Sequence, residues 1–431
     1  MKEKVSMLSS VTLSLGELIH KYRTKSNVSL SELARITEVS KGTLSKLENG
    51  EVQKPEYYKL QAVTDALGIA FEEYIGLYIQ AEKSASAVLR IFSEAIDRNC
   101  PTKTVVHIAE RYLTIAKGES YDVIAKFFDI AIQKSETTLK LELLNLLIKY
   151  SRSHGIMPYI AKGLFQKYLI ERNDFSKLQE TYRSGRYLLD YVGFLSEKES
   201  LELHYRLAVH ALNLEQYRES IELSEYVIKN DITHSEYRAH AIFCACNSHY
   251  YLNEFGKSRA YLKEYSKLPF PFIRDNVSLM TGCISARSGN IDIGLTQLEE
   301  YLENPSEYNI IHVVVALTDL YIAKSDFDSL RKLFVYEEQM VNSLEDARTV
   351  PFKRAQLAYF YKLKGDFLIE KEESWKAYEY YRKSALEYAQ ISYYEKAFNS
   401  LLLITNSTLQ SNSDLDRKAV EELNFVFNLL S

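Results

Sequence analysis

Residues 38–55 read EVSKGTLSKLENGEVQKP, and this stretch decides how the first part of the chain is interpreted. Ser40 is of a residue type that caps helix N-termini, and two leucines three residues apart follow it at helical spacing. Gly50 readily adopts the left-handed conformation that ends many helices, and Pro55 blocks a helix from continuing. The stretch therefore predicts a short helix that begins after Ser40 and ends at Gly50.

Four further short helices are expected around this one. They are predicted at Leu15 to Tyr22, Leu30 to Ile36, Tyr57 to Leu67 and Phe71 to Leu77. Ser29, with Glu32 three residues later, predicts a capping box at the start of the second helix. Two short helices joined by a three-residue turn at 37–39 suit a helix-turn-helix, in which the second helix lies in the DNA major groove.

The segment SLSELARITEVSKGTLSKLENG at residues 29–50, followed by Pro55, resembles the phage-repressor-like (XRE/Cro) helix-turn-helix family. The resemblance implies that three residues of the third helix face bases and three touch phosphates. The first set is Lys41, Gly42 and Lys46, and the second is Ser40, Thr43 and Ser45. Lysine can donate to guanine O6 and N7, and hydroxyl groups can reach phosphate oxygens, so these residue types are chemically competent.

Two features favour the alternative of a docking module that does not bind DNA. Leu30 stands where the family often has a phosphate-binding glutamine. Residues 15–54 hold seven basic and five acidic residues, which is a weak charge excess for a phosphate-binding face. The lysines nevertheless cluster around the third helix, so DNA binding is the favoured interpretation.

From about residue 80 onward, helix-length segments recur, each with an aromatic residue after a short polar turn. These markers are Tyr121, Phe175, Tyr217, Phe255, Phe327 and Phe367, and Ile291 keeps the pattern without a ring. From Phe175 the spacings are 42, 38, 36, 36 and 40 residues. They are close to the tetratricopeptide period of about 34 residues. The sequence thus predicts an α-solenoid of paired helices.

In such repeats the first helix of each pair lines the inside of a superhelix, which can bind an extended peptide. The inner positions expected here are Tyr205, Val209, Phe243, Asn247, Tyr250, Asn276, Leu279, Cys283, His312, Val315 and Asp319. Asn247 lies mid-helix among apolar residues, so its amide either contacts a peptide or bonds to a neighbouring helix or water. Arg206 and Arg287 either hold a peptide carboxylate or are solvated.

The two-part organisation resembles the peptide-sensing regulators of Gram-positive bacteria and their phages and plasmids. Three stretches, HYRLAVHALNLEQYRESIELS (204–224), AIFCACNSHYYLNEF (241–255) and AYFYKLKGDFLIEKEESWKAYEYYRKS (358–384), are similar to arbitrium-peptide receptors, which control lysis and lysogeny. The resemblance implies a short signalling peptide bound in the repeat region, with Asn247 at the position of a family asparagine that contacts it.

Composition agrees with an all-α protein, because the 431 residues include 33 Tyr but only 7 Pro and 15 Gly. The net charge of -5 excludes a chain that coats nucleic acid along its whole length. No signal-peptide pattern or long apolar run occurs, so a cytoplasmic location without membrane contact is expected. We find no enzyme motif, no metal-ligand spacing and no cofactor-binding motif, and the four cysteines are expected to be reduced.

Three domains are therefore predicted: a helix-turn-helix domain at 1–78, a peptide-binding superhelix at 79–405 and a capping or dimerisation helix at 406–431. The predicted protein is a homodimeric transcriptional regulator that binds a double-stranded DNA operator and is switched by a short quorum-sensing peptide. Two alternatives stay open. One is a scaffold that sequesters a response regulator or another protein, and the other is a constitutive phage-type repressor without a peptide ligand.

Overall fold

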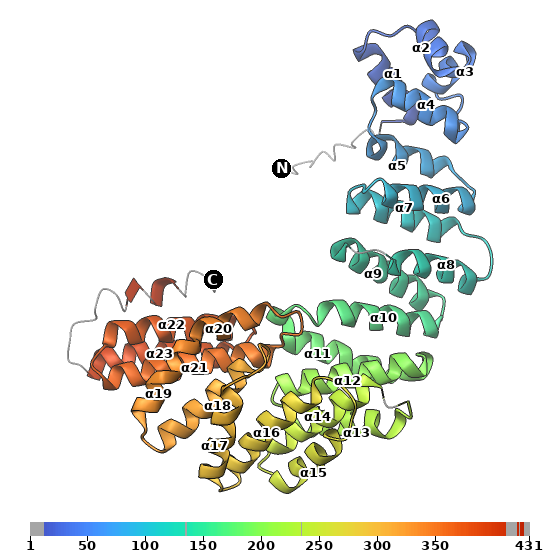
Figure 1. Cartoon of the computed structure of the whole chain (residues 1–431). Helices are drawn as coiled ribbons and strands as arrows, with labels where there is room; N and C mark the ends of the chain where they lie inside the picture. Colours follow the sequence, from blue (N-terminus) through green and yellow to red (C-terminus); the bar gives the residue numbers. More distant parts are fainter. Residues whose placement is uncertain (1–12, 134–135, 234, 411–419, 422, 426–431) are drawn as a thin grey trace, which may run out of the picture. The chain divides into compact units, whose positions relative to one another are not determined.

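The computed structural model describes residues 13–133, 136–233, 235–410, 420–421 and 423–425. All regular elements in these ranges are helices (Figure 1), which confirms the all-α prediction. The chain divides into two compact units, Met1–Lys167 and Tyr168–Ser431, called unit 1 and unit 2 below. The predicted helix-turn-helix therefore lies within a larger unit, and the domain boundary after residue 78 stays a prediction.

Unit 1 begins with the five predicted short helices. Their bounds are α1 Leu15–Lys25, α2 Leu30–Thr37, α3 Lys41–Glu48, α4 Tyr57–Leu67 and α5 Phe71–Ala81. Ser29 and Ser40 cap α2 and α3 as expected, each accepting a bond from the backbone amide three residues later. The predicted capping box at Ser29 is wrong in one respect, because the Glu32 carboxylate accepts no bond from the Ser29 backbone amide. The complete capping box is at Ser14 and Glu17, at the start of α1.

Five more helices complete unit 1: α6 Ala85–Asp97, α7 Thr102–Ile115, α8 Ser120–Ile132, α9 Thr137–Ser153 and α10 Met157–Glu171, whose last residues belong to unit 2. The end of α5 and the residue that follows it are bonded to α7 and to the loop before α4. Arg111 donates to the backbone oxygens of Ile79, Gln80 and Glu82 at 2.8–2.9 Å. The buried Glu82 carboxylate also pairs with Lys54 at 2.7 Å. These bonds tie the helix-turn-helix to the first helix pair.

Unit 2 consists of helix pairs. Its elements are η1 Phe175–Lys177, α11 Leu178–Tyr187, η2 Leu188–Phe194, α12 Glu197–Asn213, α13 Tyr217–Asn230, α14 Glu236–Tyr251, α15 Phe255–Tyr265, α16 Ile273–Arg287, α17 Ile291–Leu302, α18 Ile310–Ala323, α19 Phe327–Leu333, η3 Phe334–Tyr336, α20 Glu337–Asn342, η4 Ser343–Glu345, α21 Pro351–Glu370, α22 Ser374–Ala389 and α23 Tyr394–Gln410. Consecutive helices pack against each other, and α12 also packs on α14, and α18 on α21. This arrangement confirms the predicted helical repeat.

The turn inside each pair follows one rule. A residue with positive φ stands two positions before the second helix, which lets the chain reverse without breaking the pairing. These residues are Glu215, Asn253, Gly289, Ser325 and Glu372. The predicted turn before Phe367 is wrong, because Phe367 lies inside α21. Gly365 serves close packing there, since a Cβ would lie 2.6 Å from the Tyr381 ring. The turn comes at Glu372, and Trp375 is the ring that follows it.

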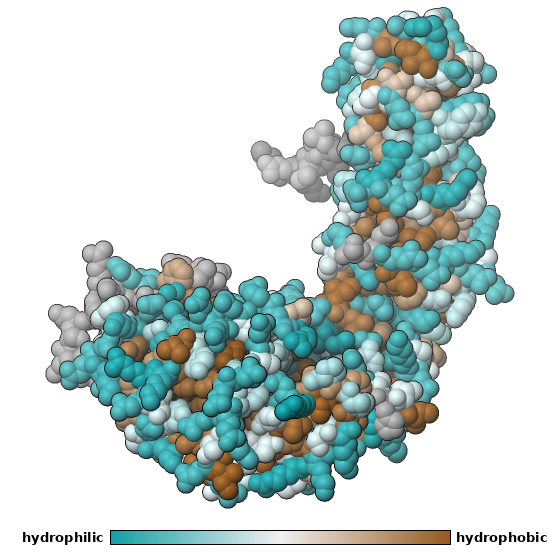
Figure 2. Space-filling view, viewed as in Figure 1, coloured by the Kyte–Doolittle hydropathy of each residue, from teal (hydrophilic) through white to brown (hydrophobic). Residues whose placement is uncertain are grey.

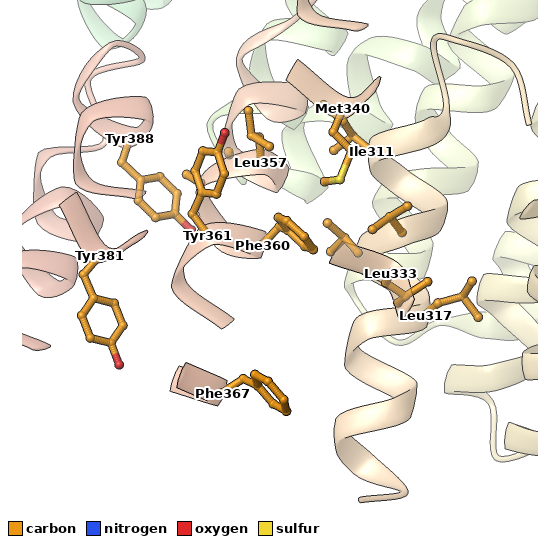
Figure 3. Close-up of a cluster of buried hydrophobic side chains, with 14 of the residues drawn as sticks. Ile311, Leu317, Leu333, Met340, Leu357, Phe360, Tyr361, Phe367, Tyr381 and Tyr388 are labelled. Atoms are coloured by element: carbon orange, nitrogen blue, oxygen red, sulfur yellow. The ribbon is translucent and has the colours of Figure 1, made fainter. Parts of the chain in front are cut away.

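A large hydrophobic core of unit 2 draws most of its residues from helices α18 to α23 and a few from α16 and α17. Figure 3 shows Ile311 and Leu317 from α18, Met340 from α20 and Phe360 from α21 among its side chains. Met340 and Phe360 are fully buried, so their contacts in this core are shielded from solvent. On the face drawn in Figure 2, hydrophilic residues cover most of the helices and hydrophobic residues appear between them in smaller patches.

The first and last parts of unit 2 also touch, through a set of polar bonds that we call the closing contact. Ser392 Oγ donates to the backbone oxygens of Ser176 at 2.6 Å and Phe175 at 3.1 Å. The Tyr393 hydroxyl donates to the backbone oxygen of Asn213, and Lys396 pairs with Glu215. The Asn213 side-chain oxygen in turn accepts the Phe352 amide at 3.1 Å. The closing contact therefore joins η1 and the α12–α13 turn to α21 and the start of α23.

Beyond Gln410 the structure describes only five residues, of which Val420 and Phe425 are exposed and Leu423 packs against the large core. Val426, Leu429 and Leu430 of the predicted capping or dimerisation helix lie outside the described residues. Among the helices that the structure describes, none combines the length and the apolar composition that crossing a bilayer would require.

Candidate functional site

Helix α3 is fixed against α1 by packing and by a charged contact. Leu44 and Leu47 are buried beneath it. At its last residue, Glu48 accepts two bonds from Arg23, at 2.6 and 2.7 Å, and lies 2.8 Å from His20 Nδ1. These partners hold the pKa of Glu48 below its usual value, against the opposing effect of burial. The α3 axis is therefore set by side chains on its inner face, which leaves the outer face available.

The structure places the six predicted DNA-contacting residues on the outer side and at the start of α3. Lys41, Gly42 and Lys46 are exposed, and neither lysine makes an ion pair with any described residue. Ser40 is the N-cap, accepting the Thr43 amide at 3.1 Å, and the two hydroxyls share a bond of 2.8 Å. Thr43 and Ser45 are half-buried. The two lysines are thus the side chains best placed to reach a ligand.

Asn247 and Asn276, both predicted to contact a peptide, differ in their bonding. Asn247 is half-buried and its amide nitrogen donates to the Phe243 backbone oxygen at 2.8 Å. No hydrogen bond to its side-chain oxygen is found within the described chain. Asn276 instead donates to the Tyr265 hydroxyl at 2.9 Å and accepts from Asn309 at 3.0 Å. Of these two amides, Asn247 is therefore the one whose side-chain oxygen accepts no bond from a described residue.

The predicted arginines lie against the predicted tyrosines. The Arg206 guanidinium is 5.1 Å from the Tyr205 ring centroid and bonds to Glu202 at 3.1 Å. Arg287 is 4.8 Å from the Tyr250 ring centroid and donates to Asn253 at 3.0 Å. The structure thus forms two cation–π pairs, one on α12 and one linking α14 to α16.

Aromatic rings connect α12 with α14 and with the segment that precedes α16. Tyr205 stacks on His240 with 5.5 Å between ring centroids, and His240 stacks on Phe272 at 4.8 Å. Burial lowers the pKa of His240, the negative charge of Glu236 opposes that shift, and the positive charges of Arg206 and Arg348 add to it. These two arginines therefore lie near the same imidazole although they are far apart in sequence.

A charged cluster near His312 was not predicted from the sequence. Lys353 is fully buried, its Nζ lies 4.4 Å from the Tyr308 ring centroid, and Arg348 lies 4.9 Å from the same centroid. Burial lowers the pKa of Lys353 to about 8, and burial together with Lys353 lowers that of His312 to about 4. Only His312 was expected here, because no spacing rule links it to Arg348 and Lys353.

A second missed residue is Tyr359, which donates to Asp319 at 2.9 Å. Burial raises the pKa of Asp319, although the Tyr359 bond and the positive charge of Arg287 oppose that shift. The Asp319 carboxylate is thus connected electrostatically to the Arg287–Tyr250 pair.

Comparison with known proteins identifies the first part of the chain. The helix-turn-helix family model matches residues 19–74, which contain α2, α3 and α4. A helix-turn-helix domain is therefore present. In sequence, the chain matches no curated protein.

Two solved structures are similar over most of the chain. A Rap protein complexed with competence and sporulation factor is 11% identical, with 94% of this chain and 99% of that chain covered and a TM-score of 0.37. Bacillus thuringiensis PlcR in complex with the peptide PapR7 and DNA is 13% identical, with 90% and 99% covered and a TM-score of 0.26. These TM-scores are too low for either likeness to decide fold or function.

Proposed function

We propose that the protein is a transcriptional regulator that reads a DNA operator with α3. One observation carries the proposal: Lys41 and Lys46 are exposed on the second helix of a helix-turn-helix, and neither pairs with a carboxylate in the part of the chain that the structure describes. Lysines at these positions can donate to guanine or to phosphate oxygens, whereas lysines already paired with carboxylates would lose that capacity. Ser40, Gly42, Thr43 and Ser45 complete the proposed DNA surface.

The test is binding of the full chain to DNA flanking its own gene, measured by mobility shift at fixed salt. Lys46→Ala should abolish the specific shift. Lys263→Ala, which removes an exposed lysine of unit 2, serves as the matched control and should leave binding unchanged. A Lys46→Ala protein that binds the operator like wild type would overturn the assignment of α3. The absence of any specific shift in wild type would instead favour a protein-sequestering scaffold.

We further propose that unit 2 binds a short signalling peptide through Asn247, Phe243, Tyr250, Tyr205, Arg206, Asn276 and Arg287. The unused side-chain oxygen of Asn247 supports this, because it can accept a peptide N–H while neighbouring rings pack against peptide side chains. Asn276 would contribute through its support of Tyr265. By the sequence resemblance given above, the peptide belongs to the quorum-sensing class, and the arbitrium receptors of phages are the proposed subclass.

Peptide response is tested with short peptides encoded just downstream of the gene, added to the mobility shift. Asn247→Ala should remove the response while leaving basal DNA binding intact. Asn230→Ala is a matched control, because Asn230 makes the same bond to a backbone oxygen one turn earlier but lies exposed near the end of α13. An unchanged response in Asn247→Ala would refute this site. A wild-type shift indifferent to every peptide would favour a constitutive repressor.

The proposed switch acts through a homodimer, since two symmetric recognition helices suit a palindromic operator. An exposed apolar stripe on α23 supports dimerisation: Tyr394, Phe398 and Leu402 are 56%, 53% and 42% exposed at helical spacing. A peptide that binds one conformer about 100-fold better than the other would shift the balance by about 2.7 kcal/mol. Phe398→Asp should yield monomers in light-scattering measurements, and an unchanged mass would remove this stripe as the interface.

A further inference from the structure

Two cations share one aromatic ring in unit 2. Arg348 and Lys353 lie 4.9 and 4.4 Å from the centroid of Tyr308, which precedes α18. The only carboxylate bonded to either cation in the described chain is Asp346, which Arg348 engages through Nε at 3.0 Å and through a terminal nitrogen at 2.6 Å. The cluster therefore carries two positive charges against one negative charge.

No carboxylate of the described residues bonds to Lys353. Its ammonium donates to the Ser343 backbone oxygen at 2.5 Å and faces the Tyr308 ring, while the whole residue is buried. An ammonium has three donors, and a buried charge without a close counter-ion is costly. Lys353 thus supplies a fixed positive charge behind the ring that the fold only partly compensates.

Asp275 supplies a second negative charge that acts on Arg348, but no bond from either cation to it is found among the described residues. Its two oxygens instead accept bonds of 2.5–2.6 Å from Tyr301, Ser306 and Asn309. The guanidinium of Arg348 bonds to Asp346 through Nε and one terminal nitrogen. The second terminal nitrogen makes no hydrogen bond to any residue that the structure describes, so it can donate to a ligand.

We infer that Arg348, backed by Tyr308 and Lys353, binds a carboxylate of the ligand, specifically the C-terminal carboxylate of a short peptide. The Arg348 side chain is 68% exposed, so an incoming carboxylate reaches it directly. The buried Lys353 is a positioning residue that acts through its charge and through the ring. This inference rests on the proposed peptide-binding function of unit 2 and names the chemical group that the peptide must present.

The test uses two hexapeptide pools of identical composition, one with free C-terminal carboxylates and one with C-terminal amides. The full chain is incubated with each pool, separated from unbound peptide by gel filtration, and the retained peptides are quantified by mass spectrometry. Wild type should retain the acid pool at least about tenfold better, as expected for a hydrogen bond to a charged group. Arg348→Gln should bring that ratio close to one.

Two further variants serve as a control for exposed arginines and as a test of the Lys353 charge. Arg218→Gln removes another exposed arginine that pairs with a carboxylate, and it should keep the full preference. Lys353→Met keeps the length of the buried side chain and should reduce the preference by removing the charge. Equal retention of both pools by wild type would overturn this inference while leaving peptide binding in place. An Arg348→Gln protein that keeps the preference would also overturn it, and retention of neither pool would refute peptide binding itself.

Discussion

Removing the Glu48 carboxylate should loosen the recognition helix from the rest of unit 1. Glu48 accepts a bidentate pair of hydrogen bonds from Arg23. The exposed fraction of the side chain is 6% for Glu48 and 14% for Arg23. Removing one partner of a fully buried ion pair costs about 3–5 kcal/mol, and a pair at the edge of the core should cost about 2–3 kcal/mol. Glu48→Ala should therefore destabilise the helix-turn-helix by about 2–3 kcal/mol.

Hydrogen exchange followed by mass spectrometry measures this effect locally, which matters because a chain with two units does not unfold in one step. Amides of α1 and α3 should exchange roughly 30- to 150-fold faster in Glu48→Ala than in wild type, since 1.4 kcal/mol corresponds to a factor of ten. Operator affinity should fall with it. Glu51→Ala, which alters an exposed glutamate three residues later, is the control and should match wild type.

The difference should also depend on pH in a defined direction. The pKa of Glu48 is lower in the folded chain than its usual value, so the stability it contributes is present above that usual value. It is lost as the pH falls through the folded-state pKa. Wild type and Glu48→Ala should therefore converge at acidic pH. Equal exchange rates at neutral pH, or an equal effect of Glu51→Ala, would refute the idea that this pair holds α3.

Three further predictions test the fold directly. Gly16→Ala should destabilise the helix-turn-helix by about 1–2 kcal/mol, because its Cβ would lie 2.3 Å from a backbone oxygen of α3, whereas Gly42→Ala meets open space and should stabilise α3 by up to about 1 kcal/mol. The same exchange measurement compares them, and equal signs would contradict the packing argument. Burial lowers the folded-state pKa of Lys353 to about 8, below the ordinary 10.5, so its unfavourable contribution to the free energy of unfolding should disappear between these pH values. The difference in free energy of unfolding between wild type and Lys353→Met should therefore shift in favour of wild type across this range, and a constant difference would contradict this. Asn213→Ala should lower the urea midpoint of unit 2, because it leaves a backbone amide of α21 unpaired at a cost of about 1–3 kcal/mol. Asn230→Ala is the control, and equal midpoints would show that the bond from Asn213 to α21 does not contribute to stability.

Local signals in the sequence predicted the helix-turn-helix well. Ser29 and Ser40 act as caps because a side-chain oxygen satisfies a nearby backbone amide whatever the rest of the fold does. The repeat was also predicted, because its turns recur at nearly constant spacing. The turn before Phe367 was misplaced because Gly365 has two possible uses, a turn or a close approach, and only the position of Tyr381 distinguishes them.

The candidate ligand-binding residues were predicted only in part. Counting along helices gave Tyr205 as an inner position, and Arg206 was named separately as a possible carboxylate contact, but their cation–π contact was not predicted. It could not find that Asn276 is already bonded to Asn309, nor that Arg348 and Lys353 meet at Tyr308, because these contacts join segments that sequence spacing does not relate. Bonding state and charge balance are properties of the folded chain, and they decided which predicted residues stay available.

The closing contact affects when unit 2 can complete its folding during translation. Repeat arrays usually grow one pair at a time, because each repeat touches only its neighbours. Here Ser392 and Tyr393 bond to residues 216 and 180 positions earlier, Ser176 and Asn213. At synthesis rates of about 5–20 residues per second, the first helix pairs wait roughly 10–40 s for these partners to be translated. During that interval unit 2 is an open array, and it acquires the cooperativity of a closed structure only when the start of α23 emerges.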